Sequence, residues 1–185
     1  TAASFEVVDT QAPTLTQVPD NSTVEYATQW AGADFAAEDP SGISEWRVQG
    51  DANLSINDTG YLNATQQLPV GNHSVNVSVN DSEGNVAWTM YQVSVVDTTV
   101  PSFTQVPDNV TIEYRSSWDG VSFAAQDASG INVWSVNDTS FSIDHQGNLS
   151  AVGDIPLGEY VLNISVSDTE GNTAWLVYEV TVVDT

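Results

Sequence analysis

The chain contains two copies of one sequence module, and this repeat constrains the fold more than any other feature. Residues 17–21 recur as residues 105–109, and residues 35–43 recur, with two changes, as residues 123–131. The offset between the copies is 88 residues in the first half of the module and 87 in the second. Such a repeat indicates one folding unit present twice. A functional site must therefore occur in both copies or lie where the copies differ.

The length of the chain sets its expected domain organisation. Its 185 residues accommodate two domains, each of about 90 residues, a size at which a β-sandwich core is stable without disulfides. Cysteine is absent, which excludes a disulfide framework and a thiolate metal site. We expect an N-terminal strand over residues 1–10, a first repeat over residues 11–97 and a second repeat over residues 98–185.

The charge of the chain restricts its partners. It has 25 acidic residues against two arginines, and its formal net charge is -23. This balance excludes nucleic acid, because phosphate binding depends on lysine and arginine, and it favours cations. No apolar run approaches the roughly 20 residues of a spanning helix, so we expect no membrane insertion by this segment. Residues 1–4 do not resemble a signal peptide, and we expect any targeting segment to have been removed.

Apolar and polar residues alternate with a period of two, which indicates strands in place of helices. Residues 75–80 (VNVSVN) and residues 162–167 (LNISVS) show the pattern most clearly. Proline, glycine, asparagine and aspartate separate such segments at short intervals, as turns require. Roughly seven short strands per copy predict an all-β chain of two tandem antiparallel immunoglobulin-like β-sandwich domains, with an extra N-terminal strand.

The six tryptophans form three equivalent pairs: Trp30 and Trp118, Trp46 and Trp134, Trp88 and Trp175. Their repetition favours a packing role, because each copy must fill the same core. We expect Trp46 and Trp134 in the two cores, and partial exposure of Trp30 and Trp118. A carbohydrate-binding surface would require exposed coplanar rings from Trp30, Tyr61 or Trp118.

Acceptor triplets for N-glycosylation, Asn-x-Ser/Thr, occur eleven times. They lie at Asn21, Asn53, Asn57, Asn63, Asn72, Asn76, Asn80, Asn109, Asn137, Asn148 and Asn163. Polar strand faces also produce such triplets by chance. Asn72, Asn76 and Asn80, however, are four residues apart, which places them on one face of an extended strand at intervals of about 13 Å. The intervening valines point to the opposite face, so we expect these asparagines to face solvent and to carry glycans in a secreted protein.

Several segments carry a family resemblance. The resemblance is to cadherin-like and hyalin-repeat-type immunoglobulin-like modules, and it is carried by residues 123–130, 141–144, 147–149, 160–162, 166–168 and 182–185. The junction at residues 96–101 resembles a repeat boundary of prokaryotic surface proteins. Modules of this type serve as stalks, adhesins, surface-layer building blocks or accessory domains. The resemblance therefore implies an extracellular protein at a cell surface. The absence of disulfides favours an archaeal or bacterial surface.

Cadherins bind calcium between repeats, so the resemblance also implies calcium ligands. The candidates by position are Asp39, Asp81, Asp97, Asp127 and Asp168. The chain lacks both the Leu-Asp-Arg-Glu element and the Asp-x-Asn-Asp-x-Pro run of cadherins. Aspartate is also an ordinary hairpin-turn residue, so a purely structural interpretation of these five residues stays open.

The first ten residues resemble a closing strand without a domain before it, because residues 5–10 align with residues 93–98. One interpretation is that the chain is a piece of a longer array. The other is that Phe5, Glu6, Val7 and Val8 form an inter-subunit strand that pairs with a sheet edge of another copy. Copies joined in this way would assemble head to tail into a filament.

No catalytic arrangement is recognisable in the sequence. His73 and His145 lack counterparts in the other repeat, and no glycine-rich phosphate loop is present. We therefore expect no enzyme, and no cofactor beyond structural calcium and N-linked glycans. The predicted function is a non-enzymatic structural subunit of an extracellular filament or surface layer, whose partners are copies of itself and surface glycans. The alternatives are a stalk segment of a larger adhesin and a carbohydrate-binding accessory module.

Overall fold

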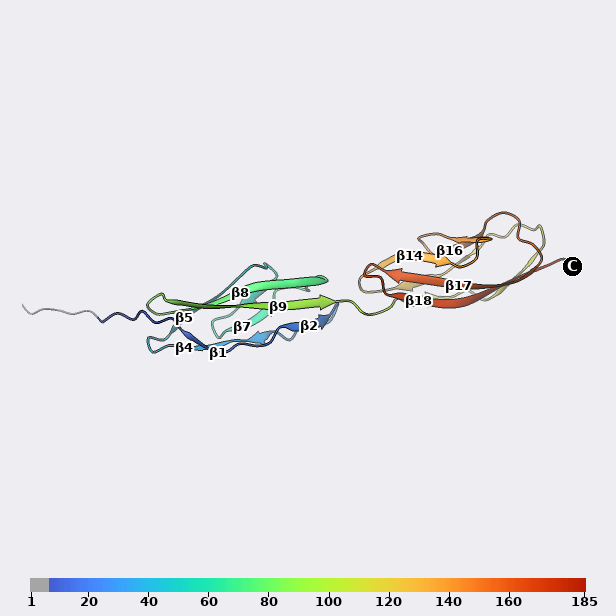
Figure 1. Ribbon diagram of the computed structural model, residues 1–185. Coiled ribbons are helices and arrows are strands. Elements are labelled where there is room, and N and C mark those ends of the chain that lie inside the picture. The colour runs from blue at the N-terminus through green and yellow to red at the C-terminus, as the bar shows by residue number, and fades with distance from the viewer. Residues whose placement is uncertain (1–6) are drawn as a thin grey trace, which may run out of the picture. The chain divides into compact units, whose positions relative to one another are not determined.

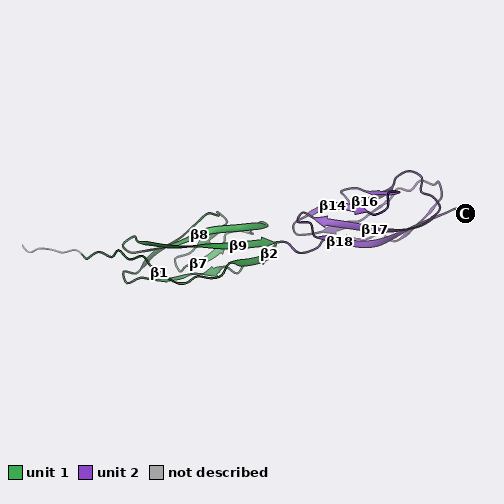
Figure 2. Ribbon diagram, in the orientation of Figure 1, with its two compact units in different colours: residues 1–96 green, residues 97–185 purple. Residues whose placement is uncertain are grey.

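The computed structural model describes residues 7–185, which form strands and loops with no helix among them (Figure 1). This part of the chain accordingly has no helix that could cross a membrane. The chain divides into two compact units, Thr1–Val96 and Asp97–Thr185 (Figure 2). Each unit is a β-sandwich, which confirms the fold predicted from the alternating pattern and the repeat.

The described part of unit 1, residues 7–96, forms nine strands. They are β1 (Thr14–Gln17), β2 (Ser22–Glu25), β3 (Ala33–Asp34), β4 (Ala36–Glu38), β5 (Ile43–Gln49), β6 (Leu54–Ile56), β7 (Tyr61–Ala64), β8 (Gly71–Asp81) and β9 (Val86–Val96). A four-stranded sheet has the order β2-β9-β8-β5 and a three-stranded sheet has the order β3-β7-β6. Strands β1 and β4 form a separate antiparallel pair.

Unit 2 repeats this arrangement. Its strands are β10 (Ser102–Gln105), β11 (Val110–Glu113), β12 (Val121–Ser122), β13 (Ala124–Gln126), β14 (Ile131–Val136), β15 (Phe141–Ile143), β16 (Asn148–Ala151), β17 (Gly158–Asp168) and β18 (Thr173–Val183). Its sheets have the orders β11-β18-β17-β14 and β12-β16-β15, and β10 pairs with β13. The long hairpins β8–β9 and β17–β18 form the centre of the four-stranded sheets.

One strand pair in each unit is parallel, which differs from the expected antiparallel arrangement. β2 runs parallel to β9, with Ser22 opposite Val93, and β11 runs parallel to β18 in the same way. The chain leaves the β1–β4 pair through residues 18–21 and then joins the other sheet. Pro19 lies in this connection, where its missing N–H interrupts the ladder of hydrogen bonds. The strand therefore changes sheets and adds to a free edge.

The cores confirm the predicted strand register. Val75, Val77 and Val79 on β8 are buried, whereas Asn72, Asn76 and Asn80 on the same strand are exposed or half-buried. Leu162, Ile164 and Val166 of β17 fill the equivalent core of unit 2. Burial of such side chains contributes about 1.5–3 kcal/mol each, so these two strands anchor their sandwiches.

The tryptophans divide differently from the expectation. Trp46 and Trp134 are buried in the cores, as predicted. Trp88 and Trp175 are 62% and 64% exposed, so the packing role expected for them is wrong. Both occupy outward positions of long alternating strands, where the sheet itself separates them from the core. Trp30 is buried and stacks on Tyr91 at 6.2 Å, so its expected exposure is also wrong.

The segment expected to form an inter-subunit strand lies at the edge of the described chain. Phe5 and Glu6 fall outside the described residues. Val7 and Val8 belong to no strand and are exposed. Of the four residues expected to form the strand, the structure describes only Val7 and Val8, and these two pair with no strand of residues 7–185.

Candidate cation sites at two clusters of aspartates

Each unit gathers three aspartates whose carboxylate oxygens lie within 4.8 Å of one another. The cluster of unit 1 contains Asp9, Asp39 and Asp81, and the cluster of unit 2 contains Asp97, Asp127 and Asp168. All five candidate ligands from the sequence fall in these clusters. Asp9 is the member that sequence reasoning missed, although its alignment with Asp97 in the repeat could have identified it.

Asp168 is the deepest member of its cluster. It ends β17 and is fully buried, and its Oδ1 accepts hydrogen bonds from the backbone N–H groups of Glu170 and Asn172. Its Oδ2 accepts a hydrogen bond of 2.8 Å from Nδ2 of Asn172, which also donates to the carbonyl oxygen of Asp97. Burial alone would raise the pKa of Asp168, but these hydrogen bonds outweigh it and lower the pKa. The buried carboxyl group is therefore anionic at neutral pH.

Asp81 has the same environment in unit 1. It ends β8, and its Oδ1 accepts hydrogen bonds from the N–H groups of Glu83 and Asn85. The Asn85 side chain donates to Asp81 Oδ2 at 2.7 Å and to the carbonyl oxygen of Asp9. Burial opposes ionisation, but the hydrogen bonds again lower the pKa. The Asp-x-x-x-Asn turn thus fixes one anionic carboxylate in each cluster.

Asp39 and Asp127 present carboxylates from the turns after β4 and β13. Oδ1 of Asp127 accepts hydrogen bonds from both the backbone N–H and the hydroxyl of Ser129. Oδ1 of Asp39 makes the same two contacts with Ser41. These short side-chain turns orient the carboxylates and leave the second oxygen of each without a hydrogen bond from the described residues.

Asp97 has a buried carboxylate oxygen that no described residue satisfies. It directly follows β9, is 9% exposed, and its Oδ1 accepts a hydrogen bond of 3.1 Å from Thr99 N. Its Oδ2 is buried and has no hydrogen-bond partner among the described residues. A buried carboxylate oxygen without a partner is costly. A cation beside Asp127 and Asp168 would provide the missing interaction.

Neither arginine of the chain contacts an aspartate of the two clusters. Arg47 and Arg115 are its only arginines, and lysine is absent. Arg47 Nη2 lies 2.7 Å from Glu45 Oε2, and the Arg115 guanidinium lies over the Tyr114 ring. Three carboxylates with hard oxygen atoms match the preference of Ca²⁺, whereas a zinc site would normally include histidine or cysteine. The donor set therefore fits calcium.

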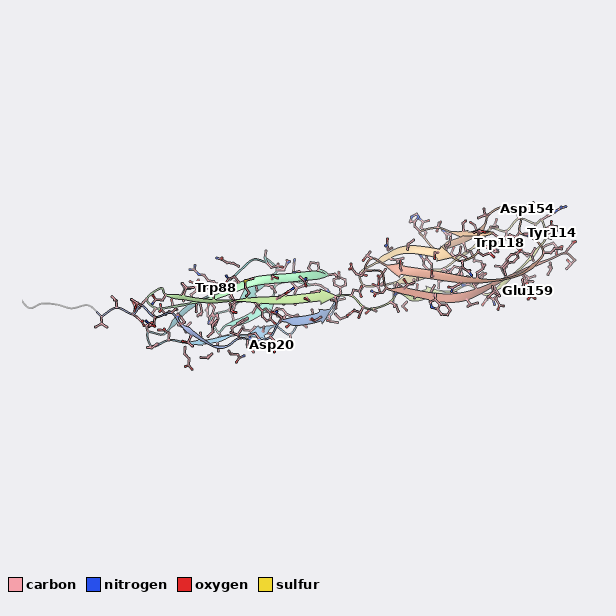
Figure 3. All side chains as sticks on the ribbon, in the orientation of Figure 1. Asp20, Trp88, Tyr114, Trp118, Asp154 and Glu159 are labelled. Carbon is pink, nitrogen blue, oxygen red and sulfur yellow. The ribbon has the colours of Figure 1, made fainter. Side chains whose placement is uncertain are left out.

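The aromatic residues considered for carbohydrate binding do not form an exposed platform. Trp30 is buried and, with Leu68, lines a cavity of about 330 Å³. The Tyr61 hydroxyl donates to the Ala31 carbonyl oxygen. Trp118, labelled in Figure 3, is half-buried and packs edge-on against Phe141, with 6.1 Å between the ring centroids. These three rings therefore do not supply the coplanar surface that such a module would need.

The glycosylation acceptors all have solvent access. Eight are exposed, namely Asn21, Asn57, Asn63, Asn72, Asn109, Asn137, Asn148 and Asn163. Asn53, Asn76 and Asn80 are half-buried. No acceptor is in a core, so the local fold blocks none of these positions by burial.

Comparison with known proteins gives matches among structures alone. No protein-family model and no curated protein matches the chain. Immunoglobulin domains 1–4 of Sidekick-1 share 13% identity, cover 94% of this chain and 49% of their own, and superpose with a TM-score of 0.54. Human protocadherin-24 EC1-2 shares 18% identity over 94% of this chain and 100% of its own, with a TM-score of 0.45. Drosophila N-cadherin EC1-4 shares 16% identity over 94% of this chain and 50% of its own, with a TM-score of 0.48.

The likeness to the Sidekick-1 domains shows the fold of the chain. It agrees with the two-sheet topology repeated in each unit and with the buried alternating residues of β8 and β17. The protein is a tandem of immunoglobulin-like β-sandwich domains.

Proposed function

We propose that the chain is a non-enzymatic structural module of an extracellular protein, and that each unit binds one Ca²⁺ at its aspartate cluster. The observation that carries this proposal is the buried Oδ2 of Asp97, which lies beside Asp127 and Asp168 and has no hydrogen-bond partner in residues 7–185. A divalent cation would neutralise part of the clustered charge and supply the missing interaction. The equivalent aspartates of unit 1 support a second ion.

The role of the ion would be structural. In unit 2 it would be held by Asp97, Asp127 and Asp168, and water could complete the six to eight oxygen ligands that Ca²⁺ requires. It would attach Asp97, the residue that directly follows β9, to two turns of unit 2. In unit 1 the ion would attach Asp9 in the same manner. Because the ion would bind the folded state and not the unfolded chain, it would raise the free energy of unfolding of each unit by mass action.

Calcium titration tests this role. After removal of bound metal with a chelator, isothermal titration calorimetry should detect two ions per chain, and Ca²⁺ should raise the melting temperature. Asp127→Asn should reduce the stoichiometry to one ion. Asp144→Asn is the matched control, because Asp144 accepts similar turn hydrogen bonds but belongs to neither cluster. Absence of calcium-dependent stabilisation, or equal effects of the two variants, would refute the cation sites.

We also propose that the module is N-glycosylated at an archaeal or bacterial cell surface. Support comes from the eleven acceptor triplets and from the solvent access of every acceptor asparagine. In this modification Asn Nδ2 attacks the anomeric carbon of a lipid-linked oligosaccharide. The lipid phosphate leaves, and the amide proton passes to a base of the transferase. Glycopeptide mass spectrometry of native protein would identify the occupied sites, and complete absence of glycans would contradict this proposal.

Head-to-tail assembly into a filament is the second candidate. It is supported by Val7 and Val8, which are 84% and 64% exposed and pair with no strand of their own chain. Residues 5–8 would add a strand to a sheet edge of the next copy. Electron microscopy of concentrated protein should show filaments that deletion of residues 1–8 abolishes and that the surface substitution Val18→Ser preserves. A monomeric intact chain would instead favour a stalk segment of a larger adhesin.

A further inference from the structure

Each unit exposes one tryptophan on the outward face of its four-stranded sheet. Trp88 lies on β9, where Figure 3 labels it, and Trp175 lies at the equivalent position of β18. Their apolar neighbours Met90 and Val177 are also exposed. An apolar patch that recurs in both copies indicates a surface that something covers.

The strand register places a glycosylation acceptor beside each tryptophan. On the outward face of unit 1, Asn76 is opposite Met90 and Ser78 is opposite Trp88. Asn76 is therefore a diagonal neighbour of Trp88, and Asn80, opposite Val86, is the other. Diagonal neighbours of this kind lie roughly 7–8 Å apart, within reach of an aromatic side chain.

Unit 2 has the same geometry. Asn163 is opposite Val177, and Ser165 is opposite Trp175, so Asn163 is the diagonal neighbour of Trp175. The residue directly opposite the indole is a small serine in both units, which leaves room next to the ring for a flat group. The pairing of acceptor, serine and tryptophan is thus repeated, although none of these residues belongs to the core.

The two asparagines also have available amide groups. No hydrogen bond among the described residues engages the side chain of Asn76 or Asn163. In contrast, Nδ2 of Asn148 donates to Asp144, and Nδ2 of Asn109 donates to Glu179. Attachment of a sugar at Asn76 or Asn163 would therefore break no side-chain hydrogen bond between the described residues.

We propose that the N-linked glycans of Asn76 and Asn163 fold back over Trp88 and Trp175, with a pyranose ring lying against each indole. A pyranose presents an apolar face of C–H groups, which suits the flat π-surface of tryptophan. The inference rests on the N-glycosylation proposed above. The covering group would thus be the chain's own modification, and it would shield the apolar patch from other proteins.

Charge and position favour the glycan over a second copy of the chain as the covering group. Each chain carries a formal net charge of -23, which opposes the stacking of the sheet face of one copy on that of another. A sugar on Asn76 or Asn163 would also stand on the face that a second copy would have to approach. The glycan meets neither obstacle, because its covalent attachment to this face holds it within reach of the ring.

Fluorine NMR can test the contact in unit 2, where Asn163 is the single acceptor on β17. Protein labelled with 5-fluorotryptophan is produced in a glycosylating host, and the Trp175 signal is assigned with Trp175→Phe. A soluble nitroxide then measures the solvent accessibility of each indole. With the glycan present, relaxation of the Trp175 signal by the nitroxide should fall by about half, because one sugar covers one face of the ring. Asn163→Gln should restore full relaxation, whereas Asn148→Gln, the control, should leave the Trp175 signal unchanged.

Each outcome bears on a separate part of the proposal. If glycopeptide analysis finds Asn163 unmodified, both the glycosylation of this site and the inference fail. If Asn163 carries a glycan but Trp175 stays as accessible as in Asn163→Gln, the inference alone fails and glycosylation stands. If Trp175 is protected in Asn163→Gln, and sedimentation shows a dimer, a second copy covers the face and the inference is overturned.

Discussion

Both ring nitrogens of His73 contact oxygen acceptors: Nδ1 lies 2.6 Å from Asp51 Oδ2 and Nε2 lies 2.8 Å from the Pro69 carbonyl oxygen. A carbonyl oxygen can only accept, so Nε2 donates. An ionised Asp51 also requires a donor at Nδ1, and the buried imidazole is then protonated at both nitrogens. Burial alone would lower the pKa of His73, but the contacts with Pro69 and Asp51 outweigh it and raise the pKa. Unit 1 therefore contains a partly buried ion pair whenever His73 is protonated, whereas Tyr160 occupies the equivalent position in unit 2 and donates to Pro156.

This pair should make the stability of unit 1 depend on pH. The folded pKa of His73 is above the unfolded value of about 6.5, so its stabilisation is complete at lower pH and is lost as the pH rises through the folded pKa. The pKa of Asp51 is lowered by the Asn53 N–H and by His73. Its stabilisation is present above about pH 3.9 and is lost as the pH falls through its folded pKa.

Urea unfolding can measure this difference between the units, with the indole NMR signals of Trp46 and Trp134 reporting units 1 and 2. Between about pH 5.5 and pH 8.5 the midpoint of unit 1 should fall and that of unit 2 should change less. At the lower pH, His73→Gln should cost unit 1 about 1–3 kcal/mol, because it leaves Asp51 without its partner. An unchanged pH dependence in this variant would show that His73 is not responsible.

The two kinds of tryptophan should differ sharply in their contribution to stability. Trp134→Ala should destabilise unit 2 by about 3–5 kcal/mol, because it leaves a cavity between Phe103 and Phe123. Trp175→Ala, in protein produced without glycans, should change stability by about 0.5 kcal/mol or less, because the ring faces solvent. Chemical denaturation of the two variants compares these values directly, and similar losses would contradict the assignment of Trp175 to the outer surface.

A close backbone approach at Gly147 should make this position intolerant of any side chain. Its φ is +84°, and a Cβ atom there would lie 2.4 Å from the Phe123 carbonyl oxygen. Gly147→Ala should therefore cost more than the roughly 1–2 kcal/mol of left-handed strain alone. Gly171→Ala is the control, because its φ is +93° but nothing lies within 4 Å of the added atom. Equal losses of thermal stability would mean that the approach to Phe123 is relieved by a backbone shift.

Loss of the Asn172 side chain should destabilise unit 2 more than loss of Asn148, which ends an exposed Asp-x-x-x-Asn turn that begins at Asp144. Asn172→Ala removes hydrogen bonds to Asp168 and to the Asp97 carbonyl, and should cost about 1–3 kcal/mol, because Asp168 is buried. It should also weaken calcium binding in unit 2. Asn148→Ala removes two exposed hydrogen bonds, one to Asp144 and one from the Ser122 hydroxyl, and should have a smaller effect because both groups can bond to water instead. Calorimetric melting with and without Ca²⁺ would measure both effects, and equal destabilisation by the two variants would refute the special role of Asn172.

The sequence alone established the features that depend on local patterns. The period of two predicted which face of β8 is buried, because adjacent residues of a strand point to opposite sides. The repeat predicted two similar units, and turn-forming residues marked the hairpins. The five candidate aspartates followed from a family resemblance, and all of them lie in the two clusters.

The tertiary structure decided what depends on contacts between distant segments. Ser22 pairs with Val93, and the two residues are separated by most of the sequence of unit 1. No local pattern could therefore predict the parallel β2–β9 pair. Repetition of Trp88 and Trp175 was consistent with either face of a sheet, and only the packed sandwich placed both rings outward. The meeting of Asp9 with Asp39 and Asp81 likewise requires three separate segments to converge. The sequence determined the alternation within each strand, whereas the pairing of strands far apart in the chain determined which side chains meet.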